Sequence, residues 1–216
     1  EQELDEGNIP VGIKEQFLEL YHIGKKLLKD YHDEKSIELS EELTEAIEKK
    51  DYTKQWYIIE SLRKTDSQPT LTMIQYLKED EIHPIVKTAI FNWLQDVKID
   101  DEVEVSKLGL QISINPKHVA EIREGITFRQ IMLCIRDVEQ ENPTLYKLLE
   151  KLLYRYAYVR YPIMPPSQDS LVIANALKGI GQQYLYEEGQ EWEDSVQKYM
   201  DELRMCETLY LSVIEE

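Results

Sequence analysis

The chain has 216 residues, enough for one substantial domain or two small ones with their own hydrophobic cores. Its 42 acidic residues outweigh 25 basic ones, and a formal net charge of −17 argues against nucleic acid and anionic lipid surfaces as partners. The unbroken apolar runs are far shorter than the roughly 20 residues that a membrane-spanning helix needs. We therefore expect no nucleic-acid binding and no membrane insertion.

Helical periodicity governs the first part of the chain. A first helix is predicted from about Val11 to Tyr31, because apolar residues recur there every three or four positions along one face. Two shorter helices are predicted over residues 36–50 and 53–65. The short link at residues 50–52 makes these two helices antiparallel neighbours.

A second pair of helices is predicted over residues 69–79 and 84–97. Each is opened by a proline, Pro69 or Pro84, which suits a first-turn position whose N–H has no helical partner. Overlaying the two helix pairs gives a period of roughly 30 residues, which lies in the range of helical repeats. Two copies also leave open a chance overlay of two amphipathic hairpins.

The stretch from Glu102 to Pro116 is the one that does not have a helical pattern. Apolar residues alternate with polar ones on both sides of Gly109, which is typical of a β-hairpin. Because a two-stranded ribbon is marginally stable alone, we expect it to lie on a helical surface. This ribbon places a boundary near residues 98–122.

Four helices are predicted after this boundary, over residues 128–141, 143–161, 167–188 and 192–214. The last has a heptad seam, which fits packing in a bundle and also dimerisation; we favour the bundle, since three neighbouring helices need a partner face. In the third helix, Gly179 and Gly181 would let two helices approach closely. The seam comprises Trp192, Val196, Tyr199, Leu203, Cys206, Tyr210 and Val213.

The predicted fold is therefore all-α with one small β-hairpin near residues 102–115. We divide it into a helical-hairpin repeat array (TPR/HEAT-like) in residues 1–98, a β-hairpin connector in residues 99–122 and a four-helix bundle-like region in residues 123–216.

No pattern in the sequence indicates catalysis. The four histidines are never three or four residues apart, the spacing that puts paired metal ligands on one helical face. His83 directly precedes Pro84 and is expected to lead into a helix. A glycine-rich phosphate loop, a nucleophile elbow and a Cys-x-x-Cys pair are absent from the sequence. We expect no catalytic residue, no cofactor and no metal.

The two cysteines, Cys134 and Cys206, fall at apolar positions of helical patterns, where a free thiol behaves as a small core side chain. We expect no disulfide between them. The printed sequence begins at Glu1 without a visible signal peptide. Together these features predict a cytoplasmic protein.

Tyrosine and arginine concentrate near residues 154–161, where the predicted helix is apolar on two roughly opposite sides. Such a helix is either central to a bundle, which we favour, or half exposed. Tyrosine and arginine contribute much of the binding energy at protein interfaces, so any exposed members of this group are candidate protein-binding residues. The candidates are Tyr154, Arg155, Tyr158, Arg160 and Tyr161.

Several short motifs resemble a known group of proteins. They are the paired helices of residues 36–97 with their Asp51-Tyr52 turn, the block LKEDEIHPIVKT at residues 77–88, the ribbon of residues 103–114 and the motif ENPTLY at residues 141–146. Over residues 36–165 the chain resembles Gram-positive bacterial proteins described as tetratricopeptide-repeat-like. That group has no established catalytic residues, and the resemblance implies a cytosolic helical-repeat scaffold that binds other proteins.

The predicted function is a non-catalytic protein–protein interaction or scaffold module, with another protein or peptide as its partner. Two alternatives stay open. One is an enzyme or small-ligand binder with its site between the two halves, near the ribbon and His118. The other is a homo-oligomer, such as a homodimer, built on the C-terminal heptad helix.

Overall fold

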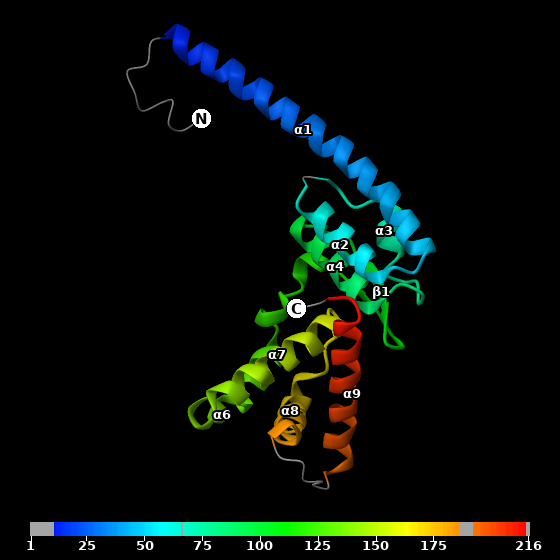
Figure 1. The fold of residues 1–216 in the computed structure, drawn as a ribbon, viewed down its shortest axis with the longest axis vertical. Helices are drawn as coiled ribbons and strands as arrows, with labels where there is room; N and C mark the ends of the chain where they lie inside the picture. The colour runs from blue at the N-terminus through cyan, green and yellow to red at the C-terminus, as the bar shows by residue number, and fades with distance from the viewer. Residues whose placement is uncertain (1–10, 66, 186–191, 215–216) are drawn as a thin grey trace.

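The computed structural model describes residues 11–65, 67–185 and 192–214, and this part of the chain is mostly helical (Figure 1). The predicted all-α fold with one small β-hairpin is confirmed. The helices of the first half are α1 (Val11–Glu48), α2 (Tyr52–Arg63), α3 (Leu71–Gln75) and α4 (Pro84–Asp96). The hairpin is β1 (Val103–Lys107) and β2 (Leu110–Ile114), and the second half has α5 (Ile126–Cys134), α6 (Arg136–Glu141), α7 (Pro143–Arg160), α8 (Ser170–Leu185) and α9 (Asp194–Leu211).

Helix α1 is one helix where the sequence predicted two. It runs without a break through residues 32–35, which contain no glycine or proline to stop it. Only its last third packs on the protein, through Leu39, Leu43 and Ala46. The rest projects away from the other helices (Figure 1).

The turn between α1 and α2 is tight, as predicted. Lys50 takes the left-handed conformation, with φ 53°, and its N–H donates to the Ile47 carbonyl at 3.0 Å. The Asp51 N–H donates to the Ala46 carbonyl at 2.9 Å, which completes a Schellman cap. The Asp51 carboxylate then accepts the Lys54 N–H at 3.0 Å and starts α2. One residue pair therefore ends one helix and begins the next.

Helix α3 is shorter than the predicted helix over residues 69–79. Thr70 is its N-cap and accepts the Met73 N–H, so that Pro69 lies before the cap and not in the first turn. Helix α4 begins as predicted, with Pro84 in its first turn and His83 as the capping residue.

The β-hairpin turns at Leu108 and Gly109, whose φ values of 51° and 75° match a two-residue turn of the kind that favours hairpins. It lies on the helices of the first half, as expected. The Ser106 N–H donates to the Leu77 carbonyl at 2.9 Å, and the Lys87 ammonium donates to the Ser106 carbonyl at 2.6 Å.

The second half differs from the prediction at its first helix, which is broken into α5 and α6. Ile135 stands at the break with φ −102° and ψ 2°, and its side chain is fully buried. The corner allows Val138 of α6 to reach the same core as Ile131 of α5. The sequence contains no glycine or proline at this point, so the break has no local signal.

Helix α9 packs against α7 and α8, so its seam is used within the chain, in agreement with the bundle interpretation. The two glycines of α8 allow this packing. A Cβ at Gly179 would lie 3.0 Å from the Trp192 ring, and one at Gly181 would lie 2.7 Å from Leu145 of α7. Close helix approach at both glycines is therefore present.

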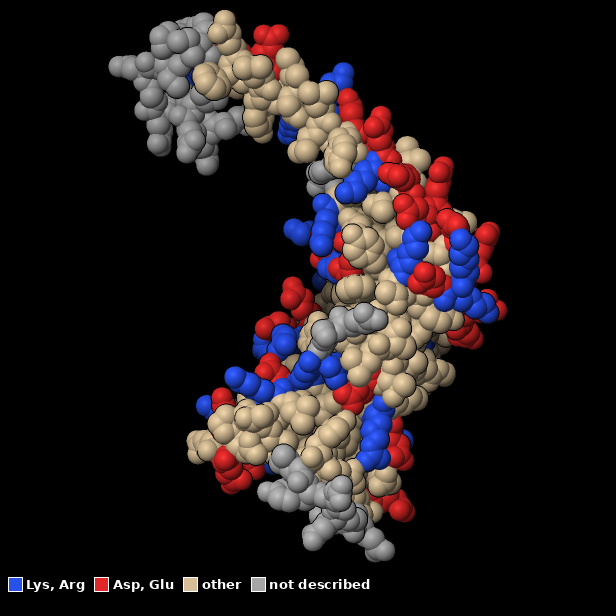
Figure 2. Space-filling view, in the orientation of Figure 1, with Lys and Arg blue, Asp and Glu red and all other residues tan. Residues whose placement is uncertain are grey.

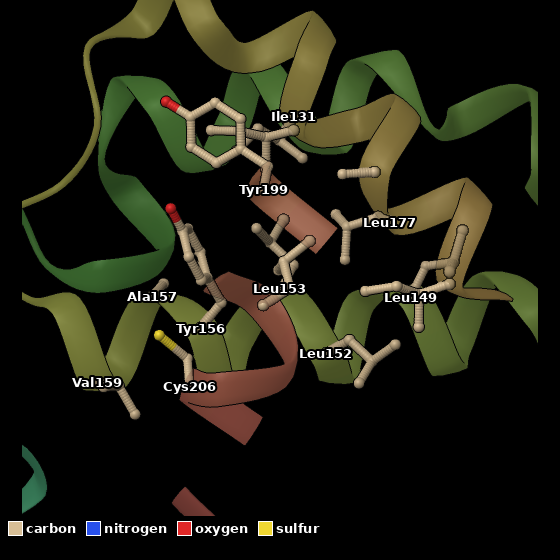
Figure 3. Packing of buried hydrophobic residues seen from close by; sticks show 14 of the residues in the cluster. Ile131, Leu149, Leu152, Leu153, Tyr156, Ala157, Val159, Leu177, Tyr199 and Cys206 are labelled. Atoms are coloured by element: carbon tan, nitrogen blue, oxygen red, sulfur yellow. The ribbon is translucent and has the colours of Figure 1, made fainter. Parts of the chain in front are cut away.

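Two hydrophobic clusters form the core. One is built from residues 39–105 together with Tyr161 of the second half, and the other from residues 128–214 together with Ile85 of the first. Figure 3 shows part of the second cluster, where Tyr156, Tyr199 and Cys206 lie close together. Cys206 is a fully buried free cysteine, and burial raises the pKa of its thiol to about 12, so the thiol stays protonated and packs as a core side chain. The division into residues 1–98, 99–122 and 123–216 stays a prediction.

Candidate functional site

The tyrosine- and arginine-rich end of α7 is mostly interior. Tyr158 is 6% exposed, Arg155 8%, Arg160 9% and Tyr161 2%, whereas Tyr154 is partly exposed. The expectation that exposed members of this group bind a partner can therefore apply only to Tyr154. The other four residues are buried because α7 lies between the first half and α9, with a partner on each side.

The tyrosine side of α7 faces the first half. The indole N–H of Trp56 donates to the Tyr158 hydroxyl at 3.1 Å, and the Tyr161 hydroxyl donates to the Gln95 side-chain oxygen at 2.6 Å. Burial raises the pKa of both phenols above their ordinary value, so they remain neutral donors and acceptors. These hydrogen bonds connect α7 to α2 and α4.

The arginine side of α7 faces α9. Arg155 donates to the Glu207 carboxylate at 2.5 Å, and Arg160 pairs with Glu202 and donates to the Ile163 carbonyl at 3.2 Å. Removing one partner of such a pair leaves a buried charge without compensation. Both arginines therefore hold the bundle together and do not offer a surface.

Lys107 is a buried lysine that the sequence patterns did not single out. Its ammonium donates to the Thr88 hydroxyl at 2.5 Å and to the carbonyls of Tyr161 and Val159 at 2.6 and 3.2 Å. These carbonyls lie at the C-terminal end of α7, where helical partners are lacking and positive charge is favourable. Burial, and then the neighbouring Lys87, lowers the pKa of Lys107 well below its ordinary value. The sequence does contain a signal for the burial of Lys107: it lies two residues beyond Val105, on the apolar face of β1.

A groove lies beside the exposed edge of Tyr154. It is bounded by the ends of α2 and α4, by the segment of residues 116–123 and by α7, and its volume is about 680 Å³. It lies between the two halves and close to the ribbon, where the alternative hypothesis placed a ligand site. His118 is exposed and is not among the lining residues.

The charges of the groove are mixed, with four basic and two acidic side chains in its lining. In Figure 2 the inward-curved side of the molecule likewise carries both blue and red groups. The charged lining residues are Arg63, Lys98, Lys117, Arg123, Asp96 and Glu121.

Two arginines of the groove have partners within the chain. The guanidinium of Arg123 stands 4.9 Å from the centre of the Tyr154 ring and donates to Glu150 at 2.6 Å. Arg63 lies 2.8 Å from Glu60 and 2.7 Å from Asp96. An arginine stacked on an aromatic ring gives a planar, amphipathic contact surface that loses little side-chain entropy when it binds.

The described residues contain no group of three or more His, Cys, Asp or Glu side chains that could hold a metal ion. Over the same residues, no helix combines the length and the apolar character that crossing a membrane requires.

Comparison with known proteins gives one relative to report. The chain is 27% identical over 184 residues to the TPR repeat-containing protein YsoA of Bacillus subtilis (strain 168), a match that covers 82% of this chain. It covers 54% of YsoA, so the chain spans about half the length of this curated relative. No family model matches the chain, and no solved structure matches it.

The similarity to YsoA supports a TPR-like family of Gram-positive bacteria. The resemblance indicated by the sequence motifs is thereby confirmed, and so is the helical-repeat character of the fold. The relative's name says nothing of a partner.

Proposed function

We propose that this protein is a non-catalytic protein-interaction module and that the groove beside Tyr154 takes a segment of the partner. The similarity to a TPR repeat-containing protein supports protein binding in general, because helical repeats build concave surfaces for other proteins. The observation that supports this groove as the binding site is the contact between Arg123 and Tyr154, which places a guanidinium group over an aromatic ring in the groove lining.

The composition of the groove indicates the kind of segment that it would bind. Val119 and Ile122 are apolar members of the lining, and a partner's carboxylate would share basic groups that already pair within the chain, Arg63 with Asp96, Lys117 with Asp100 and Arg123 with Glu150. A peptide that combines an apolar or aromatic side chain with a nearby acidic one fits this lining. Because part of the attraction is between charges near solvent, we expect binding to weaken as salt is raised.

Affinity capture from a lysate of the native host tests the proposal. The bait is the unmodified chain, and the test variant is Arg123→Ala/Tyr154→Ala, which removes the stack, together with the contact between the rings of Tyr154 and Tyr158, and leaves the buried residues of α7 unsubstituted. Tyr57→Ala is a matched control, because Tyr57 is 64% exposed on α2 and is not among the groove-lining residues. A protein retained by the unmodified chain and by the control, and lost from the groove variant, would support the proposal.

Retention of the same protein by the groove variant would contradict the proposal. A small molecule retained in place of a protein would favour the ligand-binding alternative, since the groove volume lies within the range of ligand pockets. Self-association through the α9 seam has less support, because the seam residues from Val196 to Val213 are buried against the chain's own helices. The cytoplasmic location and the lack of catalytic activity remain predictions.

A further inference from the structure

The first two-thirds of α1 carry a broad apolar face whose large side chains are about half exposed. Seven large side chains of this face are between 48% and 65% exposed. They recur at helical spacing, so they share one side of the helix. These residues are Phe17, Leu20, Tyr21, Ile23, Leu27, Leu28 and Tyr31.

In its middle part, from Phe17 to Leu27, the apolar face is similar when it is followed in either chain direction. In two antiparallel copies aligned about His22, Phe17 lies level with Leu27 of the second copy, and Leu20 lies level with Gly24. Gly24 suits such a crossing, because a Cβ built there meets nothing within 4 Å and the position leaves room for a leucine of a second helix. Tyr21 lies on one edge of the face and Ile23 on the other, so Tyr21 would lie near Tyr21 of the second copy and Ile23 near Ile23 of the second copy.

The charges that flank this face match in the same alignment. Glu19 and Lys26 are seven residues apart, on one side of the stripe, and are too distant to pair within one helix. In the antiparallel arrangement Glu19 is level with position 25 of the second copy and so lies within one residue of Lys26, and the contact is made twice by symmetry. A parallel arrangement would instead put Glu19 beside Glu19 of the second copy and Lys26 beside Lys26, so that like charges would face each other.

We propose that α1 forms an antiparallel helix pair with α1 of a second copy, centred near His22. Seven half-exposed apolar side chains per chain offer on the order of 1,000 Å² of surface over both copies, which is the size that a specific interface requires. This surface is distinct from the groove and from the buried seam of α9. The proposal does not depend on the proposed function.

Sedimentation equilibrium of the full chain over about 1–100 µM tests the proposal at concentrations where a micromolar dimer would be half formed. The unmodified chain should show a monomer–dimer equilibrium. Leu27→Glu should give a monomer throughout, because it places a charge within the apolar contact, level with Phe17 of the second copy. Its far-ultraviolet circular dichroism and melting temperature should stay near those of the unmodified chain, since Leu27 is 65% exposed.

Charge reversal tests the antiparallel register. Glu19→Lys and Lys26→Glu should each raise the dimer dissociation constant by about tenfold, because each replaces two attractive contacts by two repulsive ones. The double variant should return to within about threefold of the unmodified value. Lys147→Glu, at an exposed position of α7, is the control for a change of net charge.

Three results would overturn the proposal. A chain that stays monomeric at all concentrations would mean that the face is covered by another protein or another segment. A dimer that withstands Leu27→Glu would use a different surface. A double charge variant as weak as the single ones would exclude the antiparallel register.

Discussion

His83 shows how burial gives a single side chain a measurable effect. Its ring nitrogen Nδ1 accepts the Ile85 N–H at 3.3 Å, and the ring stands 5.0 Å from that of Tyr52. The side chain is 9% exposed, and burial together with the nearby charge of Lys107 lowers the pKa of His83 to about 4. The neutral ring is therefore the form that caps α4.

The pH dependence of stability follows from this depressed pKa. Between pH 4 and about 6.5 the unfolded chain binds more protons at His83 than the folded one does, so stability falls as pH is lowered through this window. The loss from this residue should be about 2 kcal/mol at pH 5. An asparagine at this position supplies a side-chain oxygen as the capping acceptor, in place of the ring nitrogen of His83, and does not titrate.

Urea midpoints measured from pH 7 to pH 4.5 check this effect. The free energy of unfolding of His83→Asn should fall less steeply with decreasing pH than that of the unmodified chain. Equal slopes for the two proteins would show that His83 already titrates normally in the folded state.

Residue patterns predicted α7 well but not the roles of its individual residues. Two apolar stripes on one helix indicated a helix with neighbours on two sides, and the structure has α4 and Trp56 of α2 on one side and α9 on the other. Which of the five tyrosines and arginines stays exposed depends on where those neighbours end. Tyr154 lies one turn before Tyr158, outside the hydrogen bond to Trp56, and no local pattern encodes that difference.

At the scale of elements, the glycines of α8 set how closely its neighbours approach. Gly181→Ala would bring a Cβ to 2.7 Å from Leu145 and 2.9 Å from Leu149, so α7 and α8 would have to separate or repack. We expect a loss of about 1–3 kcal/mol in the free energy of unfolding, typical of overpacking a well-filled core. Chemical denaturation measures it.

Gly125→Ala serves as the matched control, because its Cβ would meet only backbone oxygens, at 3.5 Å and beyond. It should change stability by no more than about 0.5 kcal/mol. A Gly181→Ala variant as stable as this control would contradict the close packing of α7 and α8.

Element boundaries were predictable where a capping residue or proline marks them and not elsewhere. Asp51 marks the start of α2 and Pro84 the start of α4. The alternation of apolar and polar residues, together with Gly109, predicts the hairpin. The junction at residues 32–35 and the break at Ile135 contain neither glycine nor proline. Residues 32–35 were predicted as a break and are continuous helix, whereas Ile135 was predicted to lie within a helix and stands at a corner. In both places tertiary packing, and not the local sequence, decides the structure.

At the scale of the whole molecule, the two hydrophobic clusters are joined by polar contacts. Thr88 of α4 donates to the Tyr158 carbonyl at 2.6 Å, and Lys107 of the hairpin reaches the end of α7. Because these contacts are buried, we expect the two halves to unfold together in one transition.

Tyr158→Ala and Tyr154→Ala separate the structural part of α7 from the candidate binding part. Tyr158→Ala empties a buried site and leaves the Trp56 N–H without its acceptor, so it should cost about 3–5 kcal/mol. Tyr154→Ala, at a partly exposed position, should cost no more than about 1 kcal/mol. Urea denaturation followed by tryptophan fluorescence measures both; equal losses would contradict the different placement of the two rings.

The central claim is that the groove beside Tyr154 is the surface that a partner protein covers. Hydrogen exchange of the chain, alone and with its captured partner, tests it most directly. We predict slower exchange in residues 116–124 and around Tyr154, with α9 unchanged. Protection confined to α1 or α9, with the groove segment exchanging as in the free chain, would contradict it.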